Sequence, residues 1–190
     1  MVQTDDRPAL PRVDGASRGQ DPRGFTLVEL LVVVGIIGIV AGIAAPALLR
    51  ARMNSNETSA IGSVRIINTA QLDYSAACAS GFFALTFPTL AVGPGGSRGF
   101  LSQDLSYALV PQKSGYIYTM AAGATGIAGP PDCNGAATTT AYYITALPAS
   151  VGTSGTRGFA GNNSGAIWQD VSGAAPPEPF VFGPGVSPVQ

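Results

Sequence analysis

Hydrophobic and polar residues follow three successive patterns along this chain of 190 residues. Residues 25–49 form a nearly unbroken apolar run that carries one charge, on Glu29. Residues 50–78 place apolar side chains at three- and four-residue steps, which is typical of an amphipathic helix. Beyond residue 80 short alternating segments are separated by glycine and proline, which is typical of strands and turns. The pattern predicts an α+β fold in which one long helix packs on a small antiparallel sheet.

The apolar run of residues 25–49 is long enough to cross a bilayer. A helix of this length measures about 37 Å, and the hydrocarbon layer is about 30 Å thick. Glu29 lies near one end, although an isolated carboxylate in hydrocarbon costs about 2.5–3.5 kcal/mol on insertion scales. Three interpretations are open: a cleaved secretory signal peptide, a plain single-span anchor, or a segment freed by a cut between Gly24 and Phe25. The run is longer than a signal peptide needs, and a plain anchor leaves Glu29 unexplained.

Three residues in the second half of this run bear on how its helix packs. Gly38 and Gly42 have the spacing of small residues that lets two helices approach closely. Pro46 follows four residues later and has no N–H to donate to the carbonyl of Gly42, which weakens the helix there. Close packing and local melting are both open, and both are compatible with assembly.

Residues 50–80 are predicted to extend the apolar helix into a spine of about 50 residues. Its apolar stripe, which other parts of the chain must cover, consists of Met53, Ala60, Ile61, Val64, Ile67, Ala70, Tyr74 and Ala77. The polar residues that fall mostly between these positions are Arg50, Arg52, Glu57, Arg65, Asn68 and Asp73. We therefore expect one face of this helix to lie against the remainder of the chain.

Residues 81–190 are predicted to form a loop, a sheet and a tail. The loop covers residues 79–112 and holds at most one short helical turn, within 101–109. Strand-like sequences lie at 115–120, 138–147, 155–160 and 166–171, and the last two flank a turn sequence, Gly-Asn-Asn-Ser-Gly, at 161–165. We expect a meander of three to four strands on the spine helix. The proline-rich tail from residue 172 on is predicted to be an irregular, partly mobile surface segment.

Composition excludes several classes of function. Only 11% of the residues are charged, against about 25% in typical soluble domains. After residue 24 the chain has six basic and seven acidic residues, so no basic excess is available to bind nucleic acid. The chain has no histidine, the commonest metal ligand and general base. Its downstream carboxylates are scattered rather than paired, and we expect neither an enzyme nor a cofactor.

Two cysteines, Cys78 and Cys133, lie beyond the apolar run. They suit one disulfide in an oxidising compartment, worth about 4 kcal/mol in the chain-entropy model, and two free buried thiols are the alternative. The C-terminal part offers few oxygen ligands for calcium, namely the side chains of Asn162, Asn163, Asp170 and Glu178. We therefore expect no metal site.

The junction Gly24-Phe25-Thr26-Leu27-Val28-Glu29 resembles the prepilin processing motif of type IV pilins and type II secretion pseudopilins. The resemblance implies that residues 1–24 are a leader, which a prepilin peptidase of the inner membrane removes before methylating the amino group of Phe25. Glu29 then occupies the fifth mature position and Pro46 the twenty-second, as in that family. The resemblance further implies that Glu29 pairs with the amine of Phe25 in a neighbouring subunit and helps to set axial register.

The same resemblance implies a course for the whole chain. Residues 25–49 would hold the subunit in the bacterial inner membrane as a single-pass helix, and would then enter the core of a filament of sister subunits. An ATP-driven inner-membrane machine would carry out assembly. The destination would be an extracellular pilus or, as the main alternative, the periplasmic pseudopilus of a type II secretion system. A membrane-tethered extracytoplasmic binding domain that never polymerises is the second alternative.

Overall fold

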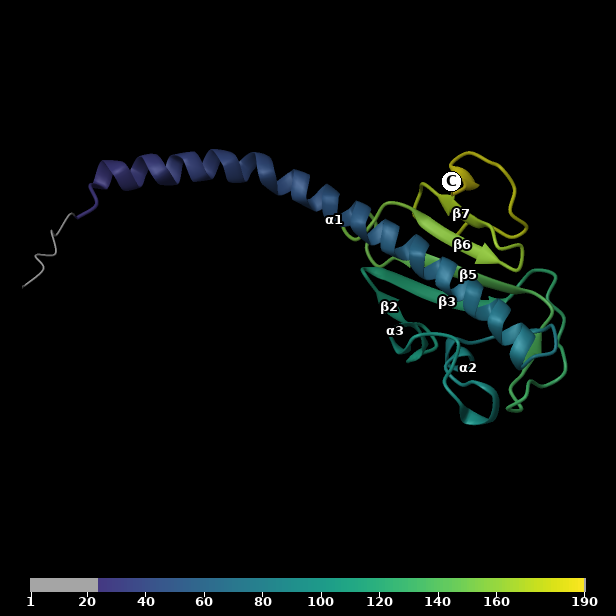
Figure 1. The fold of residues 1–190 in the computed structure, drawn as a ribbon. Coiled ribbons are helices and arrows are strands. Elements are labelled where there is room, and N and C mark those ends of the chain that lie inside the picture. Colours follow the sequence, from purple (N-terminus) through teal and green to yellow (C-terminus); the bar gives the residue numbers. More distant parts are fainter. Residues whose placement is uncertain (1–23, 190) are drawn as a thin grey trace, which may run out of the picture. The chain divides into compact units, whose positions relative to one another are not determined.

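A computed structural model describes residues 24–189 of the chain, so the predicted leader lies outside the described residues except for Gly24. The main helix, α1, spans Leu27–Ala77 and has 51 residues, which confirms the predicted spine. The chain divides after Gly42 into two compact units, and the second unit holds the remainder of α1 and all the strands (Figure 1). The α+β fold predicted from the sequence is therefore confirmed.

Six strands form one antiparallel sheet in the order β2-β3-β5-β6-β7-β8. Their bounds are β2 Gln112–Lys113, β3 Tyr116–Ala122, β5 Tyr142–Pro148, β6 Gly158–Asn162, β7 Ile167–Asp170 and β8 Val186–Pro188. A separate antiparallel pair joins β1 (Phe83–Ala84) to β4 (Thr138–Thr139). The sheet is thus larger than the predicted meander of three to four strands, and the single strand predicted at 138–147 is divided between the two sheets.

The C-terminal part of α1 crosses one face of the large sheet, over β3, β5 and β6 (Figure 1). Five residues of the predicted stripe are buried against it: Ala60, Val64, Ile67, Ala70 and Tyr74. The helix lies close to the sheet at Gly161 of β6, where an added Cβ would lie 3.0 Å from Val64 Cγ1 and 3.1 Å from the Asn68 amide atoms. A larger residue at this position would require the side chains of Val64 and Asn68 to shift by a few tenths of an ångström, so glycine permits the close contact.

Three details of the predicted stripe are wrong. Glu57 and Asn68 were assigned to the polar set but are buried, and Ala77 was assigned to the stripe but is exposed. Both polar side chains find hydrogen-bond partners on the sheet side, because the hydroxyl of Tyr142 donates to Asn68 Oδ1 at 3.2 Å and a cluster of donors surrounds Glu57. Ala77 is the last residue of α1, so the apolar stripe of the helix ends there.

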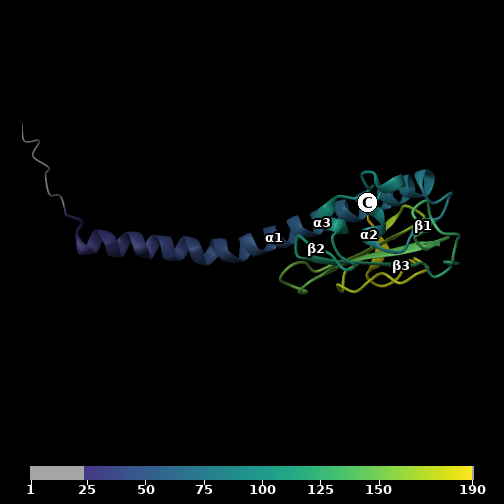
Figure 2. The same cartoon turned by 90° about the horizontal axis from the view of Figure 1, so that it is seen from below.

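The segment between α1 and β2 completes the core. It contains the short helices α2 (Phe87–Leu90), η1 (Pro94–Gly96) and α3 (Gln103–Ser106), where one short turn was predicted. Figure 2 shows α2 and α3 beside α1 on the same side of the sheet. Their apolar side chains Phe87, Leu90 and Leu105 are fully buried. This segment covers the part of the sheet that α1 leaves uncovered.

The tail after β7 packs on the opposite face of the sheet and then returns to it as β8. The ring of Phe180 stacks on Trp168 of β7, with centroids 5.4 Å apart, and lies 6.2 Å from Tyr143 of β5. The hydroxyl of Tyr143 donates to the carbonyl of Pro176, which is itself buried. The tail is irregular as predicted up to residue 185, but the prediction missed both this packing and strand β8.

Candidate functional site

Three of the residues singled out in the sequence, Gly24, Phe25 and Glu29, lie at the start of α1. Gly24 and Phe25 precede the helix in non-helical backbone, and the Phe25 side chain is 80% exposed. Thr26 occupies the N-cap position, because its Oγ1 accepts the backbone N–H of Glu29 at 3.1 Å. The bond between residues 24 and 25 therefore lies in exposed chain immediately before a capped helix.

Thr26 is a residue that the sequence interpretation missed. A threonine followed three residues later by glutamate, at the head of an apolar run, is a known helix-start signal. This signal is present in the sequence as Thr26-Leu27-Val28-Glu29, but the same residues also belong to the processing motif and were interpreted only as that motif. The cap fixes where α1 begins, and so fixes Glu29 in the first helical turn. An acidic residue there is favoured by the positive end of the helix dipole.

The apolar part of α1 leaves its side chains exposed in the isolated chain. Leu27, Val28, Leu31 and Ile39 are all more than 60% exposed, and the helix is long and apolar enough to cross a membrane by length and composition. Burying such side chains is worth about 1.5–3 kcal/mol each. A surface of this kind requires either lipid or the apolar helices of other molecules around it.

Gly38 and Gly42 lie on this exposed helix. A Cβ added at either position would meet nothing within 4 Å in the described chain, so no contact within it requires glycine there. Pro46 lies inside α1, four residues beyond Gly42. The division of the chain into two units falls between Gly42 and Pro46, where the helix has lost a backbone hydrogen bond.

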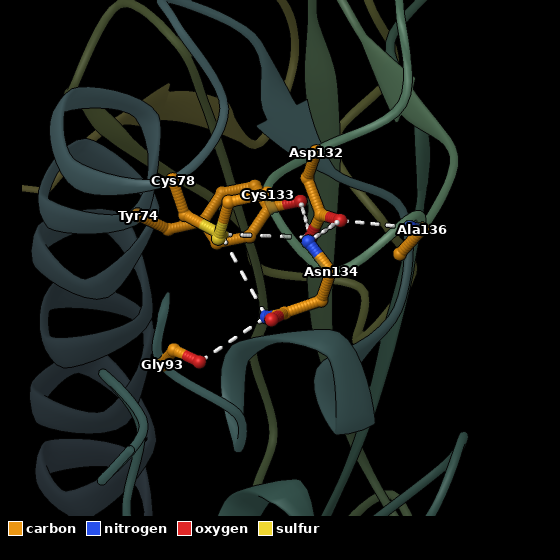
Figure 3. Close-up of a disulfide and its surroundings, with 7 residues drawn as sticks. All are labelled: Tyr74, Cys78, Gly93, Asp132, Cys133, Asn134 and Ala136. Carbon is orange, nitrogen blue, oxygen red and sulfur yellow. Dashed lines mark hydrogen bonds between the residues drawn. A yellow bond between two sulfur atoms is a disulfide. The ribbon is translucent and has the colours of Figure 1, made fainter. Parts of the chain in front are cut away.

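The two cysteines are joined at the other end of α1. Cys78, one residue past the helix, forms a disulfide with Cys133, and their Cα atoms are 5.0 Å apart (Figure 3). The backbone N–H of Cys133 also donates to the carbonyl of Cys78 at 2.9 Å. The bond ties the end of the long helix to the loop that leads into β4.

Asp132 organises the loop around this disulfide. Its Oδ1 accepts the backbone N–H groups of Asn134 and Ala136 at 2.8 and 2.7 Å, and its Oδ2 accepts the hydroxyl of Tyr74 at 2.8 Å (Figure 3). Burial alone would raise the pKa of Asp132, but these donors outweigh burial and lower its pKa. The Asn134 amide donates to the carbonyl of Gly93 at 3.2 Å. The ionised carboxylate of Asp132 thus links α1 to the loop that contains it, and the Asn134 amide links that loop to the one around Gly93.

Glu57 anchors α1 to the sheet at a second place. Its Oε1 accepts the N–H and the hydroxyl of Thr156 at 2.8 and 2.9 Å, and its Oε2 accepts Arg157 Nε at 2.8 Å and pairs with Arg157 Nη2 at 2.7 Å. Burial alone would raise the pKa of Glu57, but the hydrogen bonds from Thr156 and Arg157 lower it below its usual value. Arg157 Nη1 donates onward to Gln169 of β7 at 2.7 Å.

Of the oxygen ligands considered for calcium, Asn162, Asn163 and Glu178 line one surface cleft, whereas Asp170 does not. Glu178 accepts the Asn162 amide at 2.7 Å through Oε1, and Asp170 accepts the hydroxyl of Ser172 at 2.7 Å. Among residues 24–189, no group of three or more histidine, cysteine, aspartate or glutamate side chains is placed to hold a metal ion.

Comparison with known proteins gives a match to one family model and to two relatives. Residues 21–45 match the family model of the prokaryotic N-terminal methylation motif. The type IV major pilin protein PilA of Myxococcus xanthus is 42% identical over 52 residues, which are 27% of this chain and 24% of that protein. The type IV wide pilus major component PilA4 of Thermus thermophilus is 49% identical over 39 residues, which are 20% of this chain and 30% of that protein.

The matched segments thus span about a quarter and just under a third of the lengths of these two relatives. No solved structure matches the chain. The matched methylation motif, the two pilin relatives and the long helix packed on an antiparallel sheet agree with one another. On these grounds the chain carries the prokaryotic N-terminal methylation motif and is similar, over part of its length, to type IV pilins.

Proposed function

We propose that this chain is the precursor of a subunit of a type IV pilus-like filament. The precursor is cleaved after Gly24, its new terminus at Phe25 is methylated, and the mature subunit polymerises through α1. The observation that carries the proposal is the helix segment from Leu27 to Leu49, whose large apolar side chains are all more than 40% exposed and most of which lies within the matched motif at residues 21–45.

The chain's own residues support two stages for this helix. In the membrane, lipid covers the apolar side chains, and in the filament the same side chains meet those of sister subunits. The space around Gly38 and Gly42 supports the second stage, because helices can approach most closely where side chains are absent. Pro46, which cannot donate a backbone hydrogen bond inside α1, supports a proposed loosening of the helix at this turn during assembly.

In the proposed filament, Glu29 sets the axial register between neighbouring subunits. After cleavage, the amine of Phe25 carries a positive charge, and an opposite charge close by in a low-dielectric core attracts it strongly. The N-cap at Thr26 places Glu29 in the first helical turn, so its carboxylate lies near the same end of the helix as that amine. A neighbouring subunit shifted along the filament axis can then offer its amine to this carboxylate.

The proposed partners are sister subunits, a prepilin peptidase and an inner-membrane assembly machine, and the proposed location is the inner membrane and then the filament. A pseudopilin of a type II secretion system is the alternative within the family. Both relatives are named as pilus proteins, which favours the pilus. The second alternative, a membrane-tethered domain that never polymerises, does not explain why glycine occupies the exposed positions 38 and 42 of α1.

Substitution of the residue before the cut tests the proposal. Gly24→Ala places a methyl group at the residue whose carbonyl the peptidase attacks, and we expect the precursor to accumulate at full length in the membrane. Gel migration and mass spectrometry of the N-terminal peptide measure this, with N-methylated Phe25 expected in the unaltered chain. Gly35→Ala is the matched control, since a Cβ there also meets nothing within 4 Å, and it should be processed normally. Normal maturation of Gly24→Ala would refute the cut site.

A further inference from the structure

A surface cleft on the face of the sheet opposite α1 has the chemistry of a sugar-binding site. Its volume is about 390 Å³, within the range of roughly 300–1,000 Å³ for small-molecule sites. Three segments form it: the loop after β3, the β6–β7 hairpin, and the tail around Phe180. We call it the outer cleft, and all the residues that line it belong to the second unit.

Aromatic rings form one wall of the outer cleft. Trp168 and Phe180 both line it, are both half-buried, and stack with their planes 18° apart. Tyr143 supports Phe180 from beneath the tail, with centroids 6.2 Å apart. Because the two rings are stacked, each covers one face of the other, and the aromatic surface that remains toward the cleft is what a ligand can contact. Such a fixed apolar surface with a negative π face suits the C–H face of a sugar ring.

Polar groups form the rest of the wall. The hairpin is held by its own bond, in which the N–H of Ser164 donates to Asn162 Oδ1 at 3.0 Å. Asn163 at its tip is exposed, and within residues 24–189 its side chain makes no hydrogen bond. Its amide can both donate to and accept from a ligand hydroxyl.

Glu178 completes the polar wall and is fixed from both sides. Its Oε1 accepts the Asn162 amide at 2.7 Å, and its Oε2 accepts the N–H of Ala124 at 2.6 Å. A carboxylate has about four acceptor positions, so each oxygen keeps one for a hydroxyl donor. A preorganised acceptor of this kind needs no rearrangement when a ligand binds.

Charge selects among the ligands that this wall could take. None of the described residues lining the outer cleft is lysine or arginine, and Glu178 contributes a negative charge. Phosphates, nucleic acids and acidic sugars are therefore repelled. We propose that the outer cleft binds a neutral sugar unit of a polysaccharide, which combines an apolar ring face with several hydroxyl groups.

The experiment uses the only tryptophan of the chain, Trp168, as its reporter. The full-length chain, in a detergent without a sugar headgroup, is titrated with hexamers of β-1,4-glucose, α-1,4-glucose and β-1,4-N-acetylglucosamine. We expect a saturable change of Trp168 fluorescence, confirmed by calorimetry, with at least one hexamer. Polygalacturonate and tetramethylammonium should give none. The assay needs no filament, so its outcome is separate from that of the proposed function.

Two variants and a matched control assign the site. Asn163→Ala and Phe180→Leu should each weaken binding about tenfold, through loss of an amide hydrogen bond and of an aromatic surface. Phe182→Leu is the control, because Phe182 also contacts Trp168, at 5.1 Å, yet is not among the lining residues. The proposal is overturned if no hexamer binds, if the control loses affinity as the two variants do, or if polygalacturonate or tetramethylammonium binds equally well.

Discussion

Glu57 is buried in the structure, although the sequence predicts that it faces solvent. Its side chain is 4% exposed, whereas its partner Arg157 is 35% exposed. A buried carboxylate stays ionised only when donors replace the lost water, and Thr156 and Arg157 do so. This makes Glu57 a residue whose protonation is coupled to folding.

Removing the charge should therefore destabilise the fold in a pH-dependent way. At pH 7, Glu57→Gln should lower the free energy of unfolding by about 1–3 kcal/mol, because a charged hydrogen-bond partner is lost. The folded pKa of Glu57 is lowered, so its contribution is present above the unfolded pKa of about 4.3 and lost as pH falls through the lower folded value. Denaturant unfolding of the full-length chain from pH 7 to pH 3 should show the two proteins converging.

Asp104→Asn is the matched control for this measurement. Asp104 pairs with Lys113 at 2.6 Å, but the two side chains are 50% and 30% exposed, respectively. An exposed pair contributes about 1 kcal/mol or less. A loss at Asp104 equal to that at Glu57, or a Glu57→Gln effect that persists unchanged at pH 3, would contradict the buried-anchor account.

The residues that the sequence misplaced share one physical cause. Periodicity assigned Glu57 and Asn68 to the solvent because their side chains are polar, but burial depends on what the sheet offers opposite them. Tyr142 and Arg157 are 74 and 100 residues away in sequence, so no local pattern could reveal the partners that they supply. The buried positions Val64, Ile67 and Tyr74 could be predicted because apolar side chains need no specific partner.

At the scale of elements, α1 is one helix whose two parts have different surroundings. Its second part is stabilised by contacts with the sheet, whereas its first part exposes apolar residues that nothing in the described chain covers. Both were predictable from the sequence, because the length and periodicity of a helix are local properties. Strand β8 was not, because Val186–Pro188 contains a proline and pairs with β7 only through long-range contact.

Glu29, the one charged residue in the apolar part of α1, gives the prediction that belongs to this scale. Glu29→Leu keeps the helix and its apolar surface, so we expect normal processing but no incorporation into filaments. Sheared surface fractions, examined by electron microscopy and by immunoblotting against this chain, measure incorporation. Val28→Leu is the control, since it changes a neighbouring exposed side chain without changing charge. Filaments of unchanged amount from Glu29→Leu would remove the charge-pairing argument.

At the scale of the whole molecule, the second unit is held together by contacts between distant parts of the chain. The Cys78–Cys133 bond, the Asp132 network and the Glu57 anchor each join α1 to a loop at least 54 residues away. The sequence suggested the disulfide because only two cysteines were available, but it could not place Asp132 beside it. The hydrogen bond from Tyr74 to Asp132 became apparent only in three dimensions.

Loss of the disulfide should lower stability without changing the fold. The bond closes a loop with a sequence separation of 55 residues. The chain-entropy model gives such a loop about 4 kcal/mol, equivalent to a fall in Tm of about 10 °C. Thermal melting of Cys78→Ser/Cys133→Ser, monitored by circular dichroism, tests this, and the unaltered chain after reduction and alkylation is the control. An unchanged Tm, or two alkylatable thiols in the unreduced protein, would contradict it.

The same bond has a mechanical consequence. In the proposed filament, tension would enter the sheet-bearing part of the subunit through α1 and would act first on the Glu57 anchor and on the packing of α1 against the sheet. Once those contacts had given way, the force would reach Cys78. From there it crosses the sulfur bridge to Cys133, so the chain between these two residues bears no load while the bond is intact. Fully extended, that stretch would measure about 190 Å. The disulfide therefore limits how far one subunit can lengthen before its neighbours share the strain.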